Sequence, residues 1–349
     1  MIKRIRLSIN YRIGILYNGI KRSIVLRGAE SDFWARMYYA FFDKSFVREN
    51  RAVLQGKIIH QNGFQSGELN EYKIRRNIHR LEKGLIMPER RSVFAKDYIM
   101  ETVKAFVQEK SKPNANLKLI EWAQDVLSQY FNTVEIDDGI AKAKLLFDTN
   151  TNERSGCNYI PHTRDQNTYE TPTFDIFLNL CRQRVSTRLF QDRVVDPDLI
   201  KKALTAAITA PSACNRQPFE YLIFTSRKDI DKYIKLPGGI SGFDKNVPIL
   251  IFLIGDLSAY FDERDRHLIY IDGGLTAMNF MLALETLGLG SCALNWPDIE
   301  EKEMQIEKQL KLPKHKRCIM ALIVGYPAEK GGIAYSLKKT VDQISIYKT

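Results

Sequence analysis

Four short apolar runs in the C-terminal half of the chain constrain its fold more than any other feature. They lie at residues 221–224, 248–254, 292–295 and 319–324. Apolar runs of this length fit buried strands, and the segments between them repeat their apolar residues at helical spacing. Helices that alternate with buried strands predict a layered fold of the α/β or α+β class.

The N-terminal part of the chain has a different pattern, with few strand signals. Helical spacing predicts helices at residues 31–46, 72–85, 97–109 and 117–131. A polar stretch without motifs, at 149–170, predicts a linker. The 349 residues therefore divide into a basic N-terminal segment at 1–30, a helical accessory domain at 31–148, the linker, and a second domain at 171–349.

The positive charge of the chain is concentrated near its start. Residues 1–91 hold 19 Lys and Arg against 8 Asp and Glu, which accounts for the whole net charge of +11. Residues 1–30 alternate basic with apolar side chains at helical spacing, so they fit either an anionic membrane surface or the protein's own core. No nucleic-acid-binding signature accompanies the charge, and nucleic acid is not an expected partner.

Cysteine and histidine usage excludes several kinds of site. The five cysteines are widely spaced without a Cys-x-x-Cys pair, which is typical of a reducing compartment. The five histidines lack metal-ligand spacing, so no metal site is expected. No apolar run approaches the roughly 20 residues that span a bilayer. We therefore expect a cytoplasmic protein, or one peripheral at the inner face of the membrane.

Residues 210–219 form a turn rich in polar side chains before the first strand. Pro211 should end the preceding helix, and Ser212, Asn215 and Gln217 then offer hydrogen-bonding groups. Such a turn fits a ligand-binding loop or an ordinary connection between helix and strand.

Two further motifs flank this loop in the sequence. Arg184, Ser186 and Arg188 offer two guanidinium groups around a hydroxyl, which suits a phosphate but also suits a helix C-terminus. The Gly288-Leu289-Gly290-Ser291 element follows an apolar helix predicted at 274–287. Its glycines permit a left-handed helix end and a close approach of the backbone to a flat ring, or they simply end the helix before a strand.

Taken in this order, and with Val324-Gly325-Tyr326-Pro327 after them, these motifs resemble the FMN-dependent nitroreductase family over residues 171–349. The resemblance implies a mixed sheet flanked by helices and a homodimer with FMN at its interface. It also implies that NADH or NADPH stacks on the flavin, and that hydride passes through N5 of FMN to a small-molecule acceptor. No protein side chain is then needed as a catalytic nucleophile.

The resemblance also assigns roles to individual residues. Arg184, Ser186 and Arg188 would hold the phosphate, ribityl chain and pyrimidine edge of FMN. Lys338 and Lys339 would close the phosphate site, where many family members have arginines. Because lysine binds phosphate as a point charge and not as a fork, this chain could hold FMN more weakly.

The same resemblance places the other two motifs around the flavin ring. Ser212 and Asn215, in the loop with Pro211 and Gln217, would reach the FMN bound mainly by the other subunit. A monomer would then lack a complete site. The backbone of Leu294, Asn295 and Trp296 would lie beside the ring, although Trp296 also fits a simple core position.

A shorter resemblance concerns the N-terminal part. Residues 77–85 resemble the extension of nitroreductase-like proteins associated with polysaccharide biosynthesis. There His79, Arg80 and Lys83 fit either an anionic substrate or a solvated helix face. The alternative to an enzyme is a catalytically silent protein of the same fold that binds flavin, a membrane surface or a glycan-assembly partner.

Overall fold

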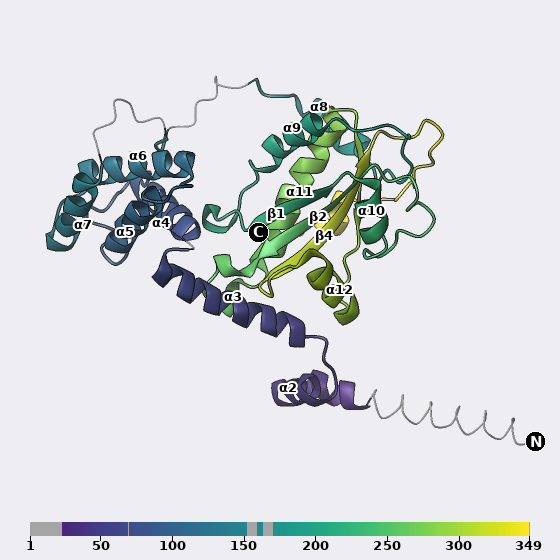
Figure 1. Ribbon diagram of the computed structural model, residues 1–349, viewed down its shortest axis with the longest axis horizontal. Helices are drawn as coiled ribbons and strands as arrows, with labels where there is room; N and C mark the ends of the chain where they lie inside the picture. Colours follow the sequence, from purple (N-terminus) through teal and green to yellow (C-terminus); the bar gives the residue numbers. More distant parts are fainter. Residues whose placement is uncertain (1–22, 69, 152–158, 163–169, 349) are drawn as a thin grey trace, which may run out of the picture.

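The computed structural model describes residues 23–68, 70–151, 159–162 and 170–348. Figure 1 shows a bundle of helices on one side and, on the other, a sheet with helices on both faces. A long helix, α3 (Val47–Ser66), runs beside the sheet domain between them.

The sheet has four strands in the order β1-β2-β4-β3, and every pairing is antiparallel. Each strand overlaps one predicted apolar run, and the bounds are β1 (Phe219–Phe224), β2 (Ile249–Asp256), β3 (Gly290–Leu294) and β4 (Lys316–Gly325). A parallel bridge between Ser186 and Ser291 adds the segment around Ser186 to the sheet, next to the edge strand β3. The predicted class of helices layered on one sheet is confirmed.

Helices cover both faces of this sheet because β2 alternates its side chains between them. Leu250, Phe252 and Ile254 pack with α10 (Arg227–Tyr233) and α12 (Glu300–Leu310). Ile249 and Ile251 pack with α9 (Pro197–Ala207) and α11 (Leu268–Thr286) on the other face. All eight residues of β2 are buried, as a strand covered on both sides requires.

The prediction for α11 was wrong at its start, because the helix begins at Leu268 and not at residue 274. Gly273 and Gly274 therefore lie inside the helix. Glycine weakens a helix by about 1 kcal/mol relative to alanine. Here packing overrides that preference, since a Cβ on Gly273 would come within 2.7 Å of Ile319.

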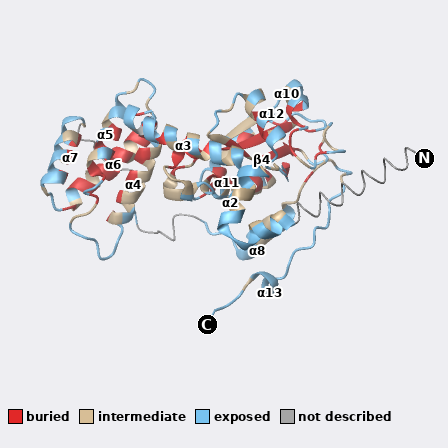
Figure 2. Cartoon of the chain, turned by 90° about the horizontal axis from the view of Figure 1, so that it is seen from below, coloured by how far each residue is buried: buried red, intermediate tan, exposed pale blue. Residues whose placement is uncertain are grey.

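The helical bundle has its own apolar core. It consists of α4 (Asn70–Leu85), α5 (Ile99–Lys110), α6 (Leu117–Thr133) and α7 (Asp138–Thr149). The largest side chains of this core, among them Tyr130 and Phe106, are fully buried. Figure 2 shows these buried residues in red along the inner sides of the helices. The sequence did not predict α7.

The segment before the bundle differs most from prediction. A single helix was expected at residues 31–46, but α2 (Asp32–Phe41) ends five residues earlier and α3 follows it. The apolar pattern did not predict α3, because this helix is only weakly amphipathic. Close contact explains one of its two glycines, because a Cβ on Gly56 would lie 2.8 Å from the Cβ of Leu257.

Helices α3 and α4 join the bundle to the sheet domain through polar contacts. His60 Nδ1 lies 2.7 Å from the carbonyl oxygen of Ser258, and the Tyr72 hydroxyl donates to Asp256 Oδ2 at 3.0 Å. Lys57 and Arg48 form ion pairs with Glu263 and Glu300 of the sheet domain. Helix α3 is therefore fixed against η2 (Leu257–Ala259), which directly follows β2, and α4 is joined to Asp256 at the end of β2.

None of the helices in the described ranges combines the length and the apolar character that would let it cross a membrane.

The junction should weaken as the pH falls. Burial lowers the pKa of His60 and of His315, which lies 3.8 Å from Asp256. A histidine with a folded-state pKa below its unfolded value of about 6.5 stabilises the protein above that pH and loses this contribution as the pH falls. We expect the Tm to drop between pH 7.5 and 5.5 by scanning calorimetry, and to drop less in His60→Gln. The control is His162→Gln, which removes an exposed histidine. If the pH dependence of the Tm decreased equally in both variants, the assignment to His60 would be contradicted.

Candidate flavin site

The segment with Arg184, Ser186 and Arg188 leaves a helix and lies beside strand β3. Helix α8 (Phe174–Gln183) ends before Arg184, which has extended backbone geometry. Thr187 N then donates to the carbonyl oxygen of Ser291 at 3.0 Å. Gly290 makes this approach possible, because a Cβ there would lie 2.6 Å from Thr187 Oγ1. The Gly-Leu-Gly-Ser element thus supports the Arg-x-Ser-x-Arg element directly.

A cavity of about 620 Å³ lies over this segment. Arg184, Ser186, Arg188 and Lys338 all line it, so four predicted residues from two distant parts of the sequence come together. Lys339 is exposed and is not among the lining residues. Segment 333–338 closes one side.

The polar groups of this cavity fit an anionic ligand. The Nε of Arg184 is buried and has no hydrogen-bond partner in the described part of the chain. Arg188 Nη1 donates only a long bond, of 3.4 Å, to the carbonyl oxygen of Ser186. Two guanidinium groups, a hydroxyl and an ammonium group are the donors that a phosphate monoester needs. The residues present therefore fit the phosphate of FMN.

The loop at 211–217 is held in a strained conformation. Cys214, Asn215 and Gln217 each have φ of 52°, in the left-handed region that side chains other than glycine rarely adopt. The hydroxyl of Ser212 accepts from Gln217 N at 3.0 Å, and Gln217 Nε2 donates to Asn215 Oδ1 at 2.9 Å. Three predicted residues thus bind one another, while Pro211 is exposed. Backbone strain of this kind is concentrated at functional sites.

A buried aspartate, Asp272, holds this loop in place through a hydrogen bond. Asp272 Oδ2 accepts from Ala213 N and from the Tyr260 hydroxyl, both at 3.1 Å. Burial raises the pKa of Asp272. Neither residue was predicted, because an aspartate inside an apolar helix and a tyrosine after a strand belong to no motif.

The third group follows β3. Leu294 is buried in the core, and the exposed Asn295 accepts a hydrogen bond at its carbonyl oxygen from Gly238 N at 2.7 Å. Trp296 Nε1 donates to Glu303 Oε1 at 2.5 Å, and its ring packs edge-on against Phe252. The indole of Trp296 is thus occupied by core contacts, and Asn295 is joined to Gly238 by a backbone bridge.

The register of the sheet separates the first motif from the loop. Phe219, after the loop, pairs with Gly255 near the end of β2. Ser291, beside the arginine segment, pairs with Val324, which pairs with Ile249 at the start of β2. At about 3.3 Å per residue, the two ends of β2 lie roughly 25 Å apart. Within one chain, the loop and the arginine cavity therefore lie at opposite ends of the sheet.

Comparison with known proteins places this domain. A model of the nitroreductase family matches residues 181–240 and 235–326. A protein of Methanothermobacter thermautotrophicus, provisionally named NADH dehydrogenase/NAD(P)H nitroreductase, is 30% identical over 156 residues, which are 44% of this chain and 79% of that one. The chain belongs to the nitroreductase family.

Two further proteins are similar to about half of this chain. A protein of Archaeoglobus fulgidus with the same provisional name is 27% identical over 44% of this chain and 86% of that one. The crystal structure of a provisionally named NADH oxidase from Clostridium acetobutylicum is 26% identical, covers 49% of this chain and 99% of that one, and has a TM-score of 0.43. The family match begins at residue 181 and therefore leaves out the bundle, whose last helix ends at Thr149.

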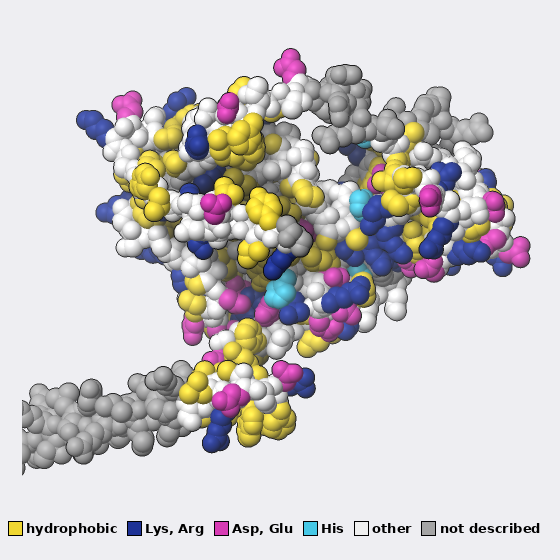
Figure 3. All heavy atoms as spheres, turned by 180° about the vertical axis from the view of Figure 1, so that it is seen from behind, with side chains coloured by type: hydrophobic (Ala, Val, Ile, Leu, Met, Phe, Trp, Pro, Cys, Tyr) yellow, Lys and Arg dark blue, Asp and Glu magenta, His cyan; other side chains and the backbone are white. Residues whose placement is uncertain are grey.

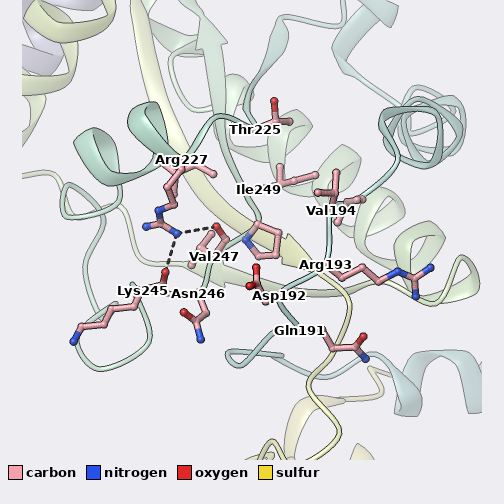
Figure 4. A pocket seen from close by; sticks show the side chains of 13 residues that line it. Gln191, Asp192, Arg193, Val194, Thr225, Arg227, Lys245, Asn246, Val247 and Ile249 are labelled. Atoms are coloured by element: carbon pink, nitrogen blue, oxygen red, sulfur yellow. Dashed lines mark hydrogen bonds between the residues drawn. The ribbon is translucent and has the colours of Figure 1, made fainter.

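A second cavity, of about 390 Å³, lies where β1 ends and β2 begins, and none of the predicted residues lines it. Figure 4 shows Arg227 there, with Nη1 directed at the carbonyl oxygens of Lys245 and Val247, at 2.8 and 3.4 Å. Its guanidinium group is thus committed to the backbone. Among the described residues, no group of three His, Cys, Asp or Glu side chains is arranged to hold a metal ion.

Gly290→Ala should displace the arginine segment. The added Cβ would meet three side-chain atoms of Thr187 within 2.8 Å, and such overpacking costs about 1–3 kcal/mol. We expect urea denaturation to show this loss, and Thr187→Gly to compensate part of it in the double variant. The control is Gly274→Ala, whose Cβ would meet nothing within 4 Å and should not destabilise the protein. Equal stability of the two alanine variants would contradict the close contact.

Proposed function

We propose that this protein is an FMN-dependent oxidoreductase that uses NADH or NADPH to reduce a small-molecule acceptor. The observation that carries the proposal is the cavity where Arg184, Ser186, Arg188 and Lys338 converge. Membership of the nitroreductase family supports the redox class. FMN supplies the chemistry when bound, because its N5 takes a hydride from the nicotinamide and its reduced form returns two electrons to the acceptor.

The side chains of the cavity would bind and orient the cofactor. Arg184 and Arg188 offer forked donors to the phosphate, and the unpartnered Nε of Arg184 gains an acceptor in this arrangement. Ser186 adds a neutral donor. Lys338 approaches from the C-terminal segment as a point charge, with Lys339 next to it. This pair gives less geometric definition than two arginines would.

A homodimer completes the proposed site. Since the two motifs lie at opposite ends of one sheet, the loop of the partner subunit is needed beside the cavity. Exposed apolar side chains support such an interface: Phe174 of α8 is 72% exposed, and Tyr335, Leu337 and Tyr347 of the C-terminal segment are more than 80% exposed. Figure 2 shows this segment, with α13 (Val341–Ile344), extending away from the core.

The bundle would act on the substrate side of this site. Helix α4 contacts η1 (Ala213–Asn215), which lies in the strained loop. The loop is the part of the chain that would reach the partner's flavin, so α4 would border the space where an acceptor approaches. A role in polysaccharide biosynthesis rests on the resemblance of residues 77–85 and remains part of the proposal.

The dimeric flavin site can be tested with mixed dimers. Two differently tagged chains, Arg184→Gln/Arg188→Gln and Ser212→Ala/Asn215→Ala, are co-expressed, and the mixed dimer is isolated through both tags. It should contain one intact site, and so bind one FMN per two chains with wild-type affinity and bleach at the flavin absorbance band when NADH or NADPH is added anaerobically. Homodimers of the arginine variant should bind FMN roughly a hundredfold more weakly, since each lost charge-assisted bond costs about 1.5–3 kcal/mol.

Arg75→Gln serves as the control for an Arg→Gln change outside the cavity, because Arg75 pairs with Glu71 on the surface of α4. A mixed dimer that behaves as the average of its parents would mean that each site is built within one chain. Wild-type protein that retains no FMN after reconstitution, or whose flavin stays oxidised with both nicotinamides, would overturn the enzyme proposal.

A membrane surface is the second candidate, and α2 favours it. This helix buries no residue, and Phe33, Phe41 and Phe42 are each more than 60% exposed. Figure 3 shows hydrophobic side chains on this helix, apart from the rest of the molecule. The preceding 30 residues carry seven Lys and Arg and one Glu. Exposed aromatic groups beside basic residues suit the interface of an anionic bilayer.

Liposome sedimentation tests this second candidate. Full-length protein should pellet with vesicles that contain anionic phosphatidylserine and not with neutral phosphatidylcholine vesicles. Phe33→Ser/Phe41→Ser should reduce pelleting several-fold, because both aromatic groups would leave the interface. Leu145→Ser, which alters a 66% exposed side chain on α7, is the control. Equal pelleting of all three proteins would remove the membrane role of α2.

A further inference from the structure

Three arginines gather where the bundle contacts the strained loop. Arg76 and Arg80 lie one turn apart on α4 and therefore share a face of the helix. Arg216 directly follows η1, which α4 contacts. Burial lowers the pKa of Arg76, and the neighbouring charges of Arg80 and Arg216 lower it further. Figure 3 shows Lys and Arg side chains concentrated on the bundle, on the side next to the sheet domain.

Two carboxylates, those of Glu101 and Asp272, interact with this cluster of three arginines, and both also accept hydrogen bonds from other groups. Glu101 accepts from Asn77 Nδ2 at 2.9 Å, and Asp272 accepts from Ala213 and Tyr260. The guanidinium groups lie over aromatic rings instead: that of Arg80 is 3.6 Å from the Tyr98 ring centre, and that of Arg76 is 5.6 Å from the ring centre of Phe261. The positive charge of the cluster is therefore incompletely balanced.

Arg216 supplies the observation that points to a ligand. Its side chain is 96% buried, since only 4% of its surface is exposed. Nη1 donates to the carbonyl oxygen of Ala213 at 3.3 Å, but the buried Nε has no partner in the described ranges. A buried donor without an acceptor costs about 1–3 kcal/mol, and more when the group is charged. An anion at this place would satisfy it.

We propose that Arg76, Arg80 and Arg216 bind the phosphate or carboxylate of the electron acceptor, so that this enzyme selects anionic acceptors. Guanidinium groups bind both oxyanions through paired N–H donors. Arg216 follows Asn215, which the proposed function places at the partner's flavin. An acceptor held through its anionic group would thus have its reducible end beside the ring. The assignment of the ligand as acceptor rests on the proposed function.

The phosphates of NADH and NADPH present the same chemistry, so the experiment separates the two sources. Arg76→Gln/Arg80→Gln is compared with Arg75→Gln, which removes a neighbouring arginine that Glu71 already balances. Arg216 is left unchanged, because the loss of a buried side chain risks the fold. The full-length chain is used throughout.

The first measurement is calorimetric titration with pyrophosphate, on FMN-loaded protein and on Arg184→Gln/Arg188→Gln protein that lacks the flavin phosphate site. Both proteins should bind pyrophosphate. Adding Arg76→Gln/Arg80→Gln should weaken binding at least about tenfold, whereas adding Arg75→Gln should not. Absence of binding, or an equal loss in both variants, overturns the anion site. This measurement needs no turnover. If the protein binds pyrophosphate in this way but has no redox activity, the proposed function and the assignment of the ligand as acceptor are overturned. The anion site itself is not.

The second measurement compares kcat/KM for 4-nitrobenzoate and for the uncharged 4-nitrobenzamide. Wild type and Arg75→Gln should prefer the carboxylate, and Arg76→Gln/Arg80→Gln should reduce this preference about tenfold with unchanged kcat/KM for NADH and NADPH. An unchanged preference with a raised KM for the nicotinamides would assign the anion to the electron donor and overturn the acceptor assignment.

Discussion

The rest of the structure depends on strand β2 and its burial on both faces. It pairs with β1 on one side and β4 on the other, and both helical layers pack on its alternating side chains. A strand enclosed in this way cannot slip by one residue without exchanging the two faces. Its register therefore fixes where the neighbouring strands end. The positions of the arginine cavity and of the strained loop follow from that register.

Because of this separation, the arginine segment and the strained loop of one chain would belong to two different sites. The cavity with Arg184 and Arg188 contains the Nε of Arg184, which has no hydrogen-bond partner among the described residues. No residue of the loop at 211–217 lines this cavity. The loop has its backbone in a strained geometry, but Arg184, Ser186, Arg188 and Lys338 do not lie at its end of the sheet. The proposed assembly of two chains would reconcile these observations, because a partner would bring the missing half to each end. Association and cofactor binding would then be thermodynamically coupled.

In the proposed function, the bundle borders the side of the site from which the substrate approaches. Its junction contains His60, Tyr72 and Asp256 in buried or half-buried positions, where each hydrogen bond replaces lost hydration. Such a junction holds α4 in a defined orientation, so the arginines of α4 meet the loop at a fixed place. The positive charge there has a structural cost, which a bound anion would offset. If the proposed anion site binds the acceptor, the same contact would link the stability of the junction to substrate choice.

Local sequence patterns determined much of this protein. Apolar runs identified all four strands, and helical spacing identified α4, α5 and α6 within a few residues. The donor chemistry of Arg184, Ser186 and Arg188 was also legible, because the residue types that bind phosphate are few. Helices α3 and α7 were missed, since their stability comes from contacts with distant segments such as Leu257 and Phe106 and not from a strong pattern of their own.

Only the tertiary structure decided which of these pieces meet. Lys338 reaches the cavity of Arg184 across more than 150 residues of sequence, whereas Lys339 beside it does not line that cavity. No sequence pattern assigned a role to Arg216, whose buried Nε has no partner in the described part of the chain. Strand pairing and the docking of α4 produce these neighbours. Both depend on long-range packing, whose free energy is shared among many residues, so no short segment of the sequence encodes it.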